Sequence, residues 1–242
     1  MKRPIVQTLI FAAALIVAAC GERPAPAASQ APANNGWVMP PVIDAVTPAG
    51  SDLKLSGHAS PLGRVVISGP GNQAYAVGAD QDGRFDLRIP RPSRDTLFTV
   101  EARVGQLGYP APYRLLVAAD PAGPIGLLSV GAPARRLDSA GPLDALDSDG
   151  SSSLLSGRGG PDAVVEVEVG APHTVRTGPD GRWSLALASV RASAIRLGSV
   201  VYAPPSGAAS VEGVLERAGA GWRITWSTPG GGRQTTWFPD RG

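Results

Sequence analysis

Cys20 is the residue of this chain best placed to do chemistry, because it is the only cysteine and ends an apolar segment. A basic start precedes an apolar run over residues 5–19, and small residues come directly before the cysteine. That order of charged, apolar and small residues is typical of an export signal that ends at a cleavage point. The 15 residues of the run would span roughly 22 Å as a helix, less than a hydrocarbon core of roughly 30 Å. A permanent transmembrane helix is therefore the weaker interpretation.

The sequence Val-Ala-Ala-Cys at residues 17–20 resembles the bacterial lipobox, in which an aliphatic residue and two small residues precede the cysteine. The resemblance implies that the sulfur of Cys20 receives a diacylglyceryl group and that residues 1–19 are removed as a signal peptide. It also implies acylation of the new amine, with palmitate the expected fatty acid. Gly21 stands where inner-membrane members of the family tend to carry aspartate, which favours the outer membrane. An ordinary signal peptide with an unmodified cysteine is the alternative.

Two histidines and two acidic runs are the other candidates for metal binding or catalysis. The runs at residues 80–83 and 147–150 resemble the start of a calcium loop, which needs a glutamate at its twelfth position. Arginine occupies that position in both, so we predict hairpin turns in which glycine supplies a positive φ. His58 and His173 are expected to be surface residues without a catalytic role. The chain has no Gly-x-Ser-x-Gly or His-Glu-x-x-His motif and no glycine-rich phosphate loop.

From these candidates we expect no catalytic residue, no metal site and no cofactor, and we classify the protein as a non-enzyme. The net charge of the mature chain argues against a further class of function, the binding of nucleic acid. Loss of Lys2 and Arg3 with the signal would reduce the 22 basic residues to 20, against 20 acidic ones. A neutral mature chain gives no electrostatic basis for binding nucleic acid. With its only cysteine acylated it can form no disulfide, so burial has to hold the fold.

The segment after the cysteine is expected to be a tether. Residues 21–40 are rich in alanine and proline and show no helical or strand period. Fully extended as polyproline II, these 20 residues would reach roughly 60 Å. We therefore assign residues 20–40 to a lipidated cysteine and a flexible, disordered linker.

From residue 42 the sequence changes to short runs that alternate apolar and polar residues, separated by glycine, proline and aspartate. Such runs at roughly ten-residue spacing predict the strands of a β-sandwich. The first seven predicted strands cover residues 42–46, 53–57, 64–68, 74–78, 84–89, 97–103 and 113–117.

The pattern then repeats. Leu-Ser-Gly occurs at residues 55–57 and again at 155–157. Asp-Gly-Arg, followed by an aromatic residue, occurs at 82–85 and again at 180–183. The offsets of 100 and 98 residues are those that two copies of one domain would have.

This repeated signature resembles bacterial immunoglobulin-like domains and carboxypeptidase-regulatory-like β-sandwiches. The resemblance implies an all-β chain with two tandem immunoglobulin-like sandwiches, at residues 41–119 and 120–242. The boundary is expected at the Asp-Pro-Ala-Gly-Pro run of residues 120–124. Members of those families serve mostly as spacers, adhesion modules and interaction surfaces in cell envelopes.

The C-terminal residues predict a hairpin rich in tryptophan. Trp222 and Trp226 alternate on one face of their strand, and Trp237 on the returning strand is expected to join them. Two interpretations stay open. The tryptophans fill or cover the core of the second sandwich, or they form an exposed platform that binds a glycan or a partner protein.

The sequence therefore leads to one main hypothesis and one alternative. The main hypothesis is an outer-membrane lipoprotein, facing the periplasm or the cell surface, that acts as a protein interaction, adhesion or assembly module of the cell envelope. The alternative is a lipoprotein that binds peptidoglycan or exopolysaccharide through the aromatic hairpin. An envelope hydrolase is a distant third. Membrane contact through the lipid and an envelope protein partner are expected in the first case, and a glycan in the second.

Overall fold

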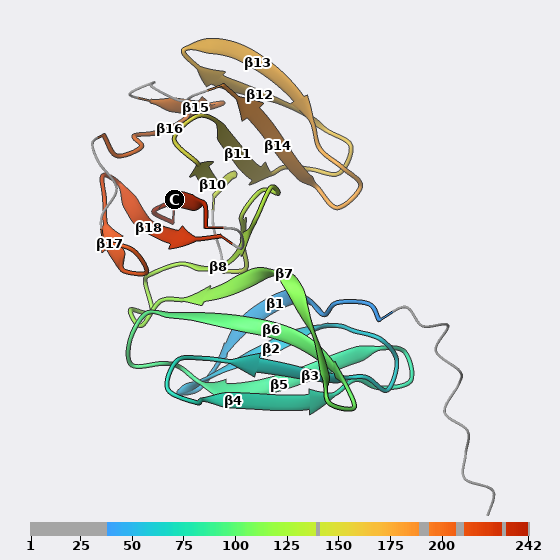
Figure 1. Ribbon diagram of the computed structural model, residues 1–242. Helices are drawn as coiled ribbons and strands as arrows, with labels where there is room; N and C mark the ends of the chain where they lie inside the picture. The colour runs from blue at the N-terminus through green and yellow to red at the C-terminus, as the bar shows by residue number, and fades with distance from the viewer. Residues whose placement is uncertain (1–37, 139–140, 189–193, 207–210, 229–230, 242) are drawn as a thin grey trace, which may run out of the picture. The chain divides into compact units, whose positions relative to one another are not determined.

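The computed structural model of the chain describes residues 38–138, 141–188, 194–206, 211–228 and 231–241 (Figure 1). Within these ranges every regular element is a β-strand. The prediction of an all-β, sandwich-type fold is therefore confirmed. None of the elements in these ranges is a helix that could cross a membrane. The predicted signal peptide, Cys20 and nearly all of the predicted tether lie outside the described residues.

The first half contains nine strands in two sheets. Strands β1, β2 and β5 form a three-stranded sheet, and a six-stranded sheet has the order β4-β3-β6-β7-β8-β9. The seven strands predicted for this half are all present, and β7 begins six residues earlier than predicted. Their bounds are Val42–Ala49 (β1), Asp52–His58 (β2), Arg64–Ser68 (β3), Ala74–Gly78 (β4), Arg84–Pro90 (β5), Thr96–Val104 (β6), Leu107–Val117 (β7), Ile125–Ser129 (β8) and Arg135–Arg136 (β9).

Alternating side chains explain why the two sheets of the first half pack together. In β5 the residues Phe85, Leu87 and Ile89 are buried, whereas the charged residues between them are exposed. Both sheets send such apolar side chains into one shared cluster. At about 25 cal/mol for each Å² of apolar surface, this burial is what holds a chain without disulfides together.

The described residues of the second half also form two sheets. A six-stranded sheet has the order β14-β11-β10-β19-β18-β17, and a four-stranded sheet has the order β13-β12-β15-β16. Their bounds are Leu143–Ser148 (β10), Ser153–Arg158 (β11), Val164–Val169 (β12), Ala171–Arg176 (β13), Arg182–Leu187 (β14), Ile195–Leu197 (β15), Val200–Tyr202 (β16), Leu215–Arg217 (β17), Gly221–Ser227 (β18) and Arg233–Pro239 (β19). The predicted hairpin is β18 and β19, and part of its glycine-rich loop lies outside the described residues.

The sequence repeat is also a structural repeat. Gly57 faces Phe85 across β2 and β5, and Gly157 faces Trp183 across β11 and β14. A Cβ added to Gly57 or to Gly157 would lie 2.1 Å from a backbone oxygen and against the facing aromatic ring. Glycine is therefore required at both positions, so that the ring can lie over the backbone.

The predicted boundary at residues 120–124 is a turn, but the first sheet does not end there. β8 pairs with β7, and β9 pairs with β8, so the hydrogen-bonded sheet of the first half continues to Arg136. The residues from Val38 onward form one compact unit. The division into 41–119 and 120–242 stays a prediction, and two strands of the first sheet lie beyond it.

Candidate functional site

The three C-terminal tryptophans point to two different faces of their sheet. In the β18–β19 pair Trp222 is opposite Phe238, whereas Arg223 is opposite Trp237. Directly opposed residues of an antiparallel pair share a face, and neighbouring residues of one strand do not. Trp237 therefore does not join the other two tryptophans, contrary to the expectation from the sequence.

Trp237 belongs to the core of the second half. It is 2% exposed and packs in the same cluster as Trp183 and Leu155. Its indole Nε1 donates a hydrogen bond to the carbonyl oxygen of Ala218 at 2.9 Å. A buried, hydrogen-bonded tryptophan of this kind has a structural role, which is one of the two interpretations left open above.

Trp226 packs between the two halves. It is 3% exposed and belongs to an apolar cluster that we call the junction cluster. Trp222 is half-buried at the margin of this cluster, and the Arg217 guanidinium lies 4.9 Å from its ring. The buried members of the junction cluster are Leu116, Ala118, Leu128, Ala134, Ala145, Leu215, Ile224, Trp226 and Phe238.

The members of the junction cluster come from both halves of the sequence repeat. Leu116 and Leu128 lie in β7 and β8 of the first six-stranded sheet, and Phe238 lies in β19 of the second. Gly126 of β8 leaves room for the Phe238 ring, which would lie 3.1 Å from an added Cβ. The aromatic hairpin therefore has one face in the core of the second half and the other face against the first half.

Side chains of the second half hydrogen-bond the free edge of β9. The backbone N–H of Ala134, just before β9, donates to Oδ2 of Asp147 at 2.8 Å, and its carbonyl oxygen accepts from the Ser156 hydroxyl at 2.6 Å. The backbone N–H of Arg136 donates to Oδ2 of Asp144 at 3.2 Å, and the Arg158 guanidinium donates to its carbonyl oxygen. Carboxylate, hydroxyl and guanidinium groups thus replace the neighbouring strand that β9 lacks.

We call this set of contacts the polar joint. It consists of the backbone of Ala134 and Arg136 and the side chains of Asp144, Asp147, Ser156 and Arg158. A free strand edge is a site where other chains can pair, so covering it prevents wrong association. The polar joint therefore holds the halves together and closes one edge of the first sheet.

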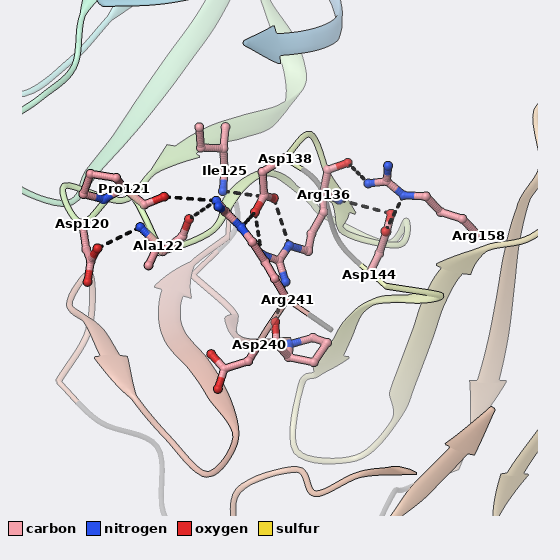
Figure 2. Close-up of polar contacts among 12 residues, drawn as sticks. Asp120, Pro121, Ala122, Ile125, Arg136, Asp138, Asp144, Arg158, Asp240 and Arg241 are labelled. Carbon is pink, nitrogen blue, oxygen red and sulfur yellow. Dashed lines mark hydrogen bonds and ion pairs between the residues drawn. The ribbon is translucent and has the colours of Figure 1, made fainter. Parts of the chain in front are cut away.

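The Arg136 side chain extends the joint toward the C-terminus, as Figure 2 shows. Its guanidinium is buried and pairs with Asp138 through Nε at 2.9 Å and Nη2 at 2.6 Å. It also donates to the carbonyl oxygen of Pro239 in β19. Arg241 donates to the same Asp138 carboxylate at 3.0 Å and to the carbonyl oxygen of Pro121 at 3.2 Å. A buried charge of this kind is tolerated because its hydrogen-bonding capacity is met.

Burial raises the pKa of Asp147 to about 6, although hydrogen bonds from Thr236 and Ala134 act in the opposite direction. The Thr236 hydroxyl donates to its Oδ1 at 2.6 Å. Asp147 in β10 therefore links β19 to the edge of β9 through its two carboxylate oxygens.

The other residues considered from the sequence lie away from this joint. His58 Nδ1 is 2.5 Å from Oδ2 of Asp44, and both side chains are about half exposed. His173 lies in the edge strand β13. No group of three metal-ligating side chains comes together within the part of the chain that the structure describes.

Both acidic runs contain turns, but only the second closes a hairpin as predicted, because β10 pairs with β11 whereas β4 and β5 lie in different sheets. Asp80 accepts hydrogen bonds from the backbone N–H groups of Asp82 and Arg84, and Gly83 has a φ of 79°. Gly150 has a φ of 92°. In the second run, however, Asp147 itself lies in β10 and not in the turn.

Sequence reasoning did not select the residues of the polar joint. The available signal was the pair of aspartates in the otherwise apolar run Leu-Asp-Ala-Leu-Asp at residues 143–147. Charged side chains are mostly exposed, so the sequence by itself favours solvent-facing positions for both aspartates. Asp144 and Asp147 are buried because a segment from the other half covers them.

Comparison with known proteins adds no family. No protein-family model matches the chain, and no curated protein matches it significantly. The functional argument therefore depends on the residues themselves.

Proposed function

We propose that this chain is a lipid-anchored lipoprotein of the cell envelope that acts as a protein interaction and assembly module. In this proposal Cys20 carries the lipid and places the protein at the outer membrane. Residues 21–40 provide reach, and the β-sandwiches present a free strand edge to a protein partner. No chemical step on a substrate is part of the proposal.

The lipobox-like sequence at residues 17–20 supports the anchor. The described chain is held by side chains from Met39 on, where the backbone N–H donates to the Ser60 hydroxyl at 3.1 Å. This supports a tether that ends at that residue. The Tyr113 hydroxyl accepts from the Ile43 N–H at 3.0 Å and donates to the carbonyl oxygen of Pro41 at 2.9 Å. Two or three acyl chains, at about 0.8 kcal/mol for each buried CH₂, would hold such a protein durably at a membrane.

The free edge of β4 is the observation that carries the assembly role. β4 pairs with β3 on one side and, among the residues that the structure describes, is the last strand of its sheet. The Gly69 N–H donates to the Gln73 carbonyl, and the Ala79 N–H donates to the Gly63 carbonyl. Because hydrogen-bonded positions alternate along an antiparallel pair, the backbone groups of Ala74, Ala76 and Gly78 point away from β3. An extended segment of a partner could pair with them, as in β-strand addition.

The composition of β4 distinguishes it from the other edge strands. Natural edges usually carry charges, prolines or bulges, or are very short. β4 reads Ala-Tyr-Ala-Val-Gly and has none of these features. The β9, β16 and β17 edges are two or three residues long. The other described edge strands contain such a residue: Asp44 in β1, Arg84 in β5, Pro172 in β13 and Arg182 in β14.

The glycan-binding alternative has less support from the geometry. It requires exposed aromatic rings, whereas Trp226 and Trp237 are buried and Trp222 is half covered. A cleft of about 440 Å³ does lie beside the hairpin, with Trp237, Thr225 and Arg223 among its lining residues. Glycan binding is therefore kept as one outcome of the experiment below.

Cross-linking in cells followed by purification tests the proposal. Ala76→Lys places a charge beside the free edge, and Ala76→Pro removes one of its outward N–H donors without touching the ladder to β3. Ala76→Thr is the matched control, because threonine suits a strand and leaves the edge intact. We expect protein partners with the wild type and with Ala76→Thr, and their loss with both other variants.

Thermal melts of the same variants separate loss of binding from loss of the fold. A partner that stays bound to folded Ala76→Lys and Ala76→Pro would contradict the role of β4. Enrichment of peptidoglycan or polysaccharide in place of protein would support the glycan alternative.

A further inference from the structure

The six-stranded sheet of the first half has two opposite edges, and they differ in what covers them. The β9 edge is hydrogen-bonded by the side chains of the polar joint. β4 is the other end of the sheet, five strand spacings away, which at about 4.8 Å each is roughly 24 Å. Figure 1 shows β4 on the side of the first half that faces away from the second half. The contacts that close the β9 edge therefore leave β4 open.

The side chains of β4 define what kind of strand can pair with it. Tyr75 and Val77 are half-buried and pack against the core of the first half. Ala74, Ala76 and Gly78, on the other face, are exposed and small. A strand added beside β4 should therefore carry apolar side chains next to Tyr75 and Val77, and small residues on the outer face.

The sequence of β4 itself meets this requirement. β4 alternates larger apolar and small residues, and in another folded copy it offers the same outward backbone groups. Among the edge strands that the structure describes, it is the one that has no charge and no proline and is longer than three residues. Residues 68–79 include no charged residue, so two such strands could lie side by side without bringing like charges together.

We propose that the partner of β4 is β4 of a second copy of this chain, in an antiparallel pair. This inference rests on the proposed role of β4 in assembly. A two-fold axis through Ala76 would place Ala76 opposite its own copy and Ala74 opposite Gly78. Because these three residues point their backbone groups outward, all of them would then be hydrogen-bonded. Two-fold dimers, in which both copies use the same surface, are the commonest homo-oligomers.

The same register joins the two cores. Tyr75 of each copy would lie opposite Val77 of the other, on the face that carries the core cluster. Asp80 is the first charged residue after β4, and the two copies of it would lie at opposite ends of the pair, where they repel little. One strand pair is a small interface. The proposed lipid anchor would offset this by confining both copies to one membrane, which raises their effective concentration.

Disulfide trapping of the full-length protein in membranes tests the pairing. The Cα atoms of a hydrogen-bonded antiparallel pair are about 5.5 Å apart, which a disulfide can span. Ala76→Cys should therefore give a covalent dimer when the membranes are treated with the thiol oxidant diamide. The wild type, with Cys20 alone, controls for disulfides at that residue.

Ala74→Cys is the matched control for the register. Its two copies would be displaced by four residues, roughly 14 Å along the strand, so we expect at least tenfold less dimer than from Ala76→Cys. Copies with Ala74→Cys and copies with Gly78→Cys, expressed together, should instead cross-link with each other. A Cβ on Gly78 meets no atom within 4 Å, so this substitution should leave the fold intact. Thermal melts check that each cysteine variant is folded.

Light scattering of the purified protein in detergent gives a measurement that needs no added cysteine. With rising protein concentration, the wild type and Ala76→Thr should approach the mass of a dimer. Ala76→Lys should stay a monomer, because it places two like charges opposite each other at the centre of the pair.

Two outcomes would overturn the pairing of two copies. One is an equal yield of dimer from Ala76→Cys and Ala74→Cys, and the other is no dimer from either folded variant. The proposed function would stand after such a result if other proteins still cross-link to the wild type and are lost with Ala76→Lys. The two proposals can therefore fail separately.

Discussion

Asp147 accepts a hydrogen bond from the backbone N–H of Ala134 at 2.8 Å, and this bond joins the two copies of the sequence repeat. The donor precedes the last strand of the first sheet, and the acceptor lies in β10 of the second half. Asp147 is 3% exposed, and its second oxygen accepts from Thr236. A buried carboxylate therefore fastens a strand edge that would otherwise be free.

This position predicts a pH-dependent stability. Burial raises the folded-state pKa of Asp147 to about 6, whereas the ordinary value is 3.8. The folded state then binds the proton more tightly than the unfolded state. The contribution of Asp147 is therefore fully present below about pH 4 and is lost as the pH rises through about 6. The loss should be on the order of 3 kcal/mol, since one unit of pKa is about 1.4 kcal/mol.

Denaturant unfolding of the wild type and of Asp147→Asn between pH 4 and pH 7.5 measures this effect. Asparagine keeps the size of the side chain and an oxygen acceptor for the Ala134 N–H, but it does not titrate. The difference in the free energy of unfolding between the two proteins should shift in favour of the variant as the pH rises. Two parallel pH profiles would show that Asp147 has an ordinary pKa.

A second prediction concerns the tryptophans. Trp226→Ala and Trp237→Ala should each lower the free energy of unfolding by about 3–5 kcal/mol, the usual cost of truncating a large buried aromatic residue. Trp222→Ala should cost less, because Trp222 is only half-buried under Arg217. Thermal melts of these variants, together with a binding assay on insoluble peptidoglycan, distinguish a core role of each tryptophan from a role in glycan binding. Retained stability of Trp226→Ala with lost glycan binding would restore the platform interpretation.

The repeated turns give a third prediction. Gly83 and Gly181 have φ values of 79° and 74°, and a Cβ on them would lie 2.4 Å and 2.6 Å from backbone oxygens. Replacing either glycine with valine should cost more than the roughly 1–2 kcal/mol of a left-handed non-glycine residue. Gly71→Ala is the control, because Gly71 has a φ of 67° but open space around it.

The same two glycine variants report on the coupling of the halves. Because the junction cluster contains residues of both, we expect one cooperative melting transition that either substitution lowers. Two transitions, each shifted by only one of the substitutions, would show that the halves unfold independently.

A fourth prediction concerns the anchor. Cys20→Ser should leave the precursor uncleaved by the lipoprotein-specific peptidase, because the sulfur that carries the diacylglyceryl group is absent. Mass spectrometry of the wild-type protein should find an acylated Cys20 as the first residue. An unmodified cysteine, or a cut elsewhere, would remove the basis for a lipoprotein.

Local sequence was enough to predict seven strands of the first half and the C-terminal hairpin, but not the short strands such as β8, β9 and β17. The alternation of Phe85, Leu87 and Ile89 with charged residues marks a half-buried strand, since side chains of a strand point to opposite faces in turn. Asp-Gly pairs mark tight turns, since glycine adopts positive φ without strain. The repeat at offsets of 100 and 98 residues also identified Gly57 and Gly157 as equivalent before any contact was known.

Only the tertiary structure decided what covers each face and each edge. Alternation shows which residues of one strand share a face with Trp226, or with Trp237, but not how the two strands are aligned. That alignment depends on the hydrogen bonds between β18 and β19. It places Trp226 and Trp237 on opposite faces of the sheet. In the same way, the sequence places Asp147 in a turn, whereas the structure has it in β10, where it binds the Ala134 N–H of the other half. Such contacts join residues far apart in the chain, so no local pattern records them. The burial of Asp147 and its raised pKa therefore follow from the packing of the two halves.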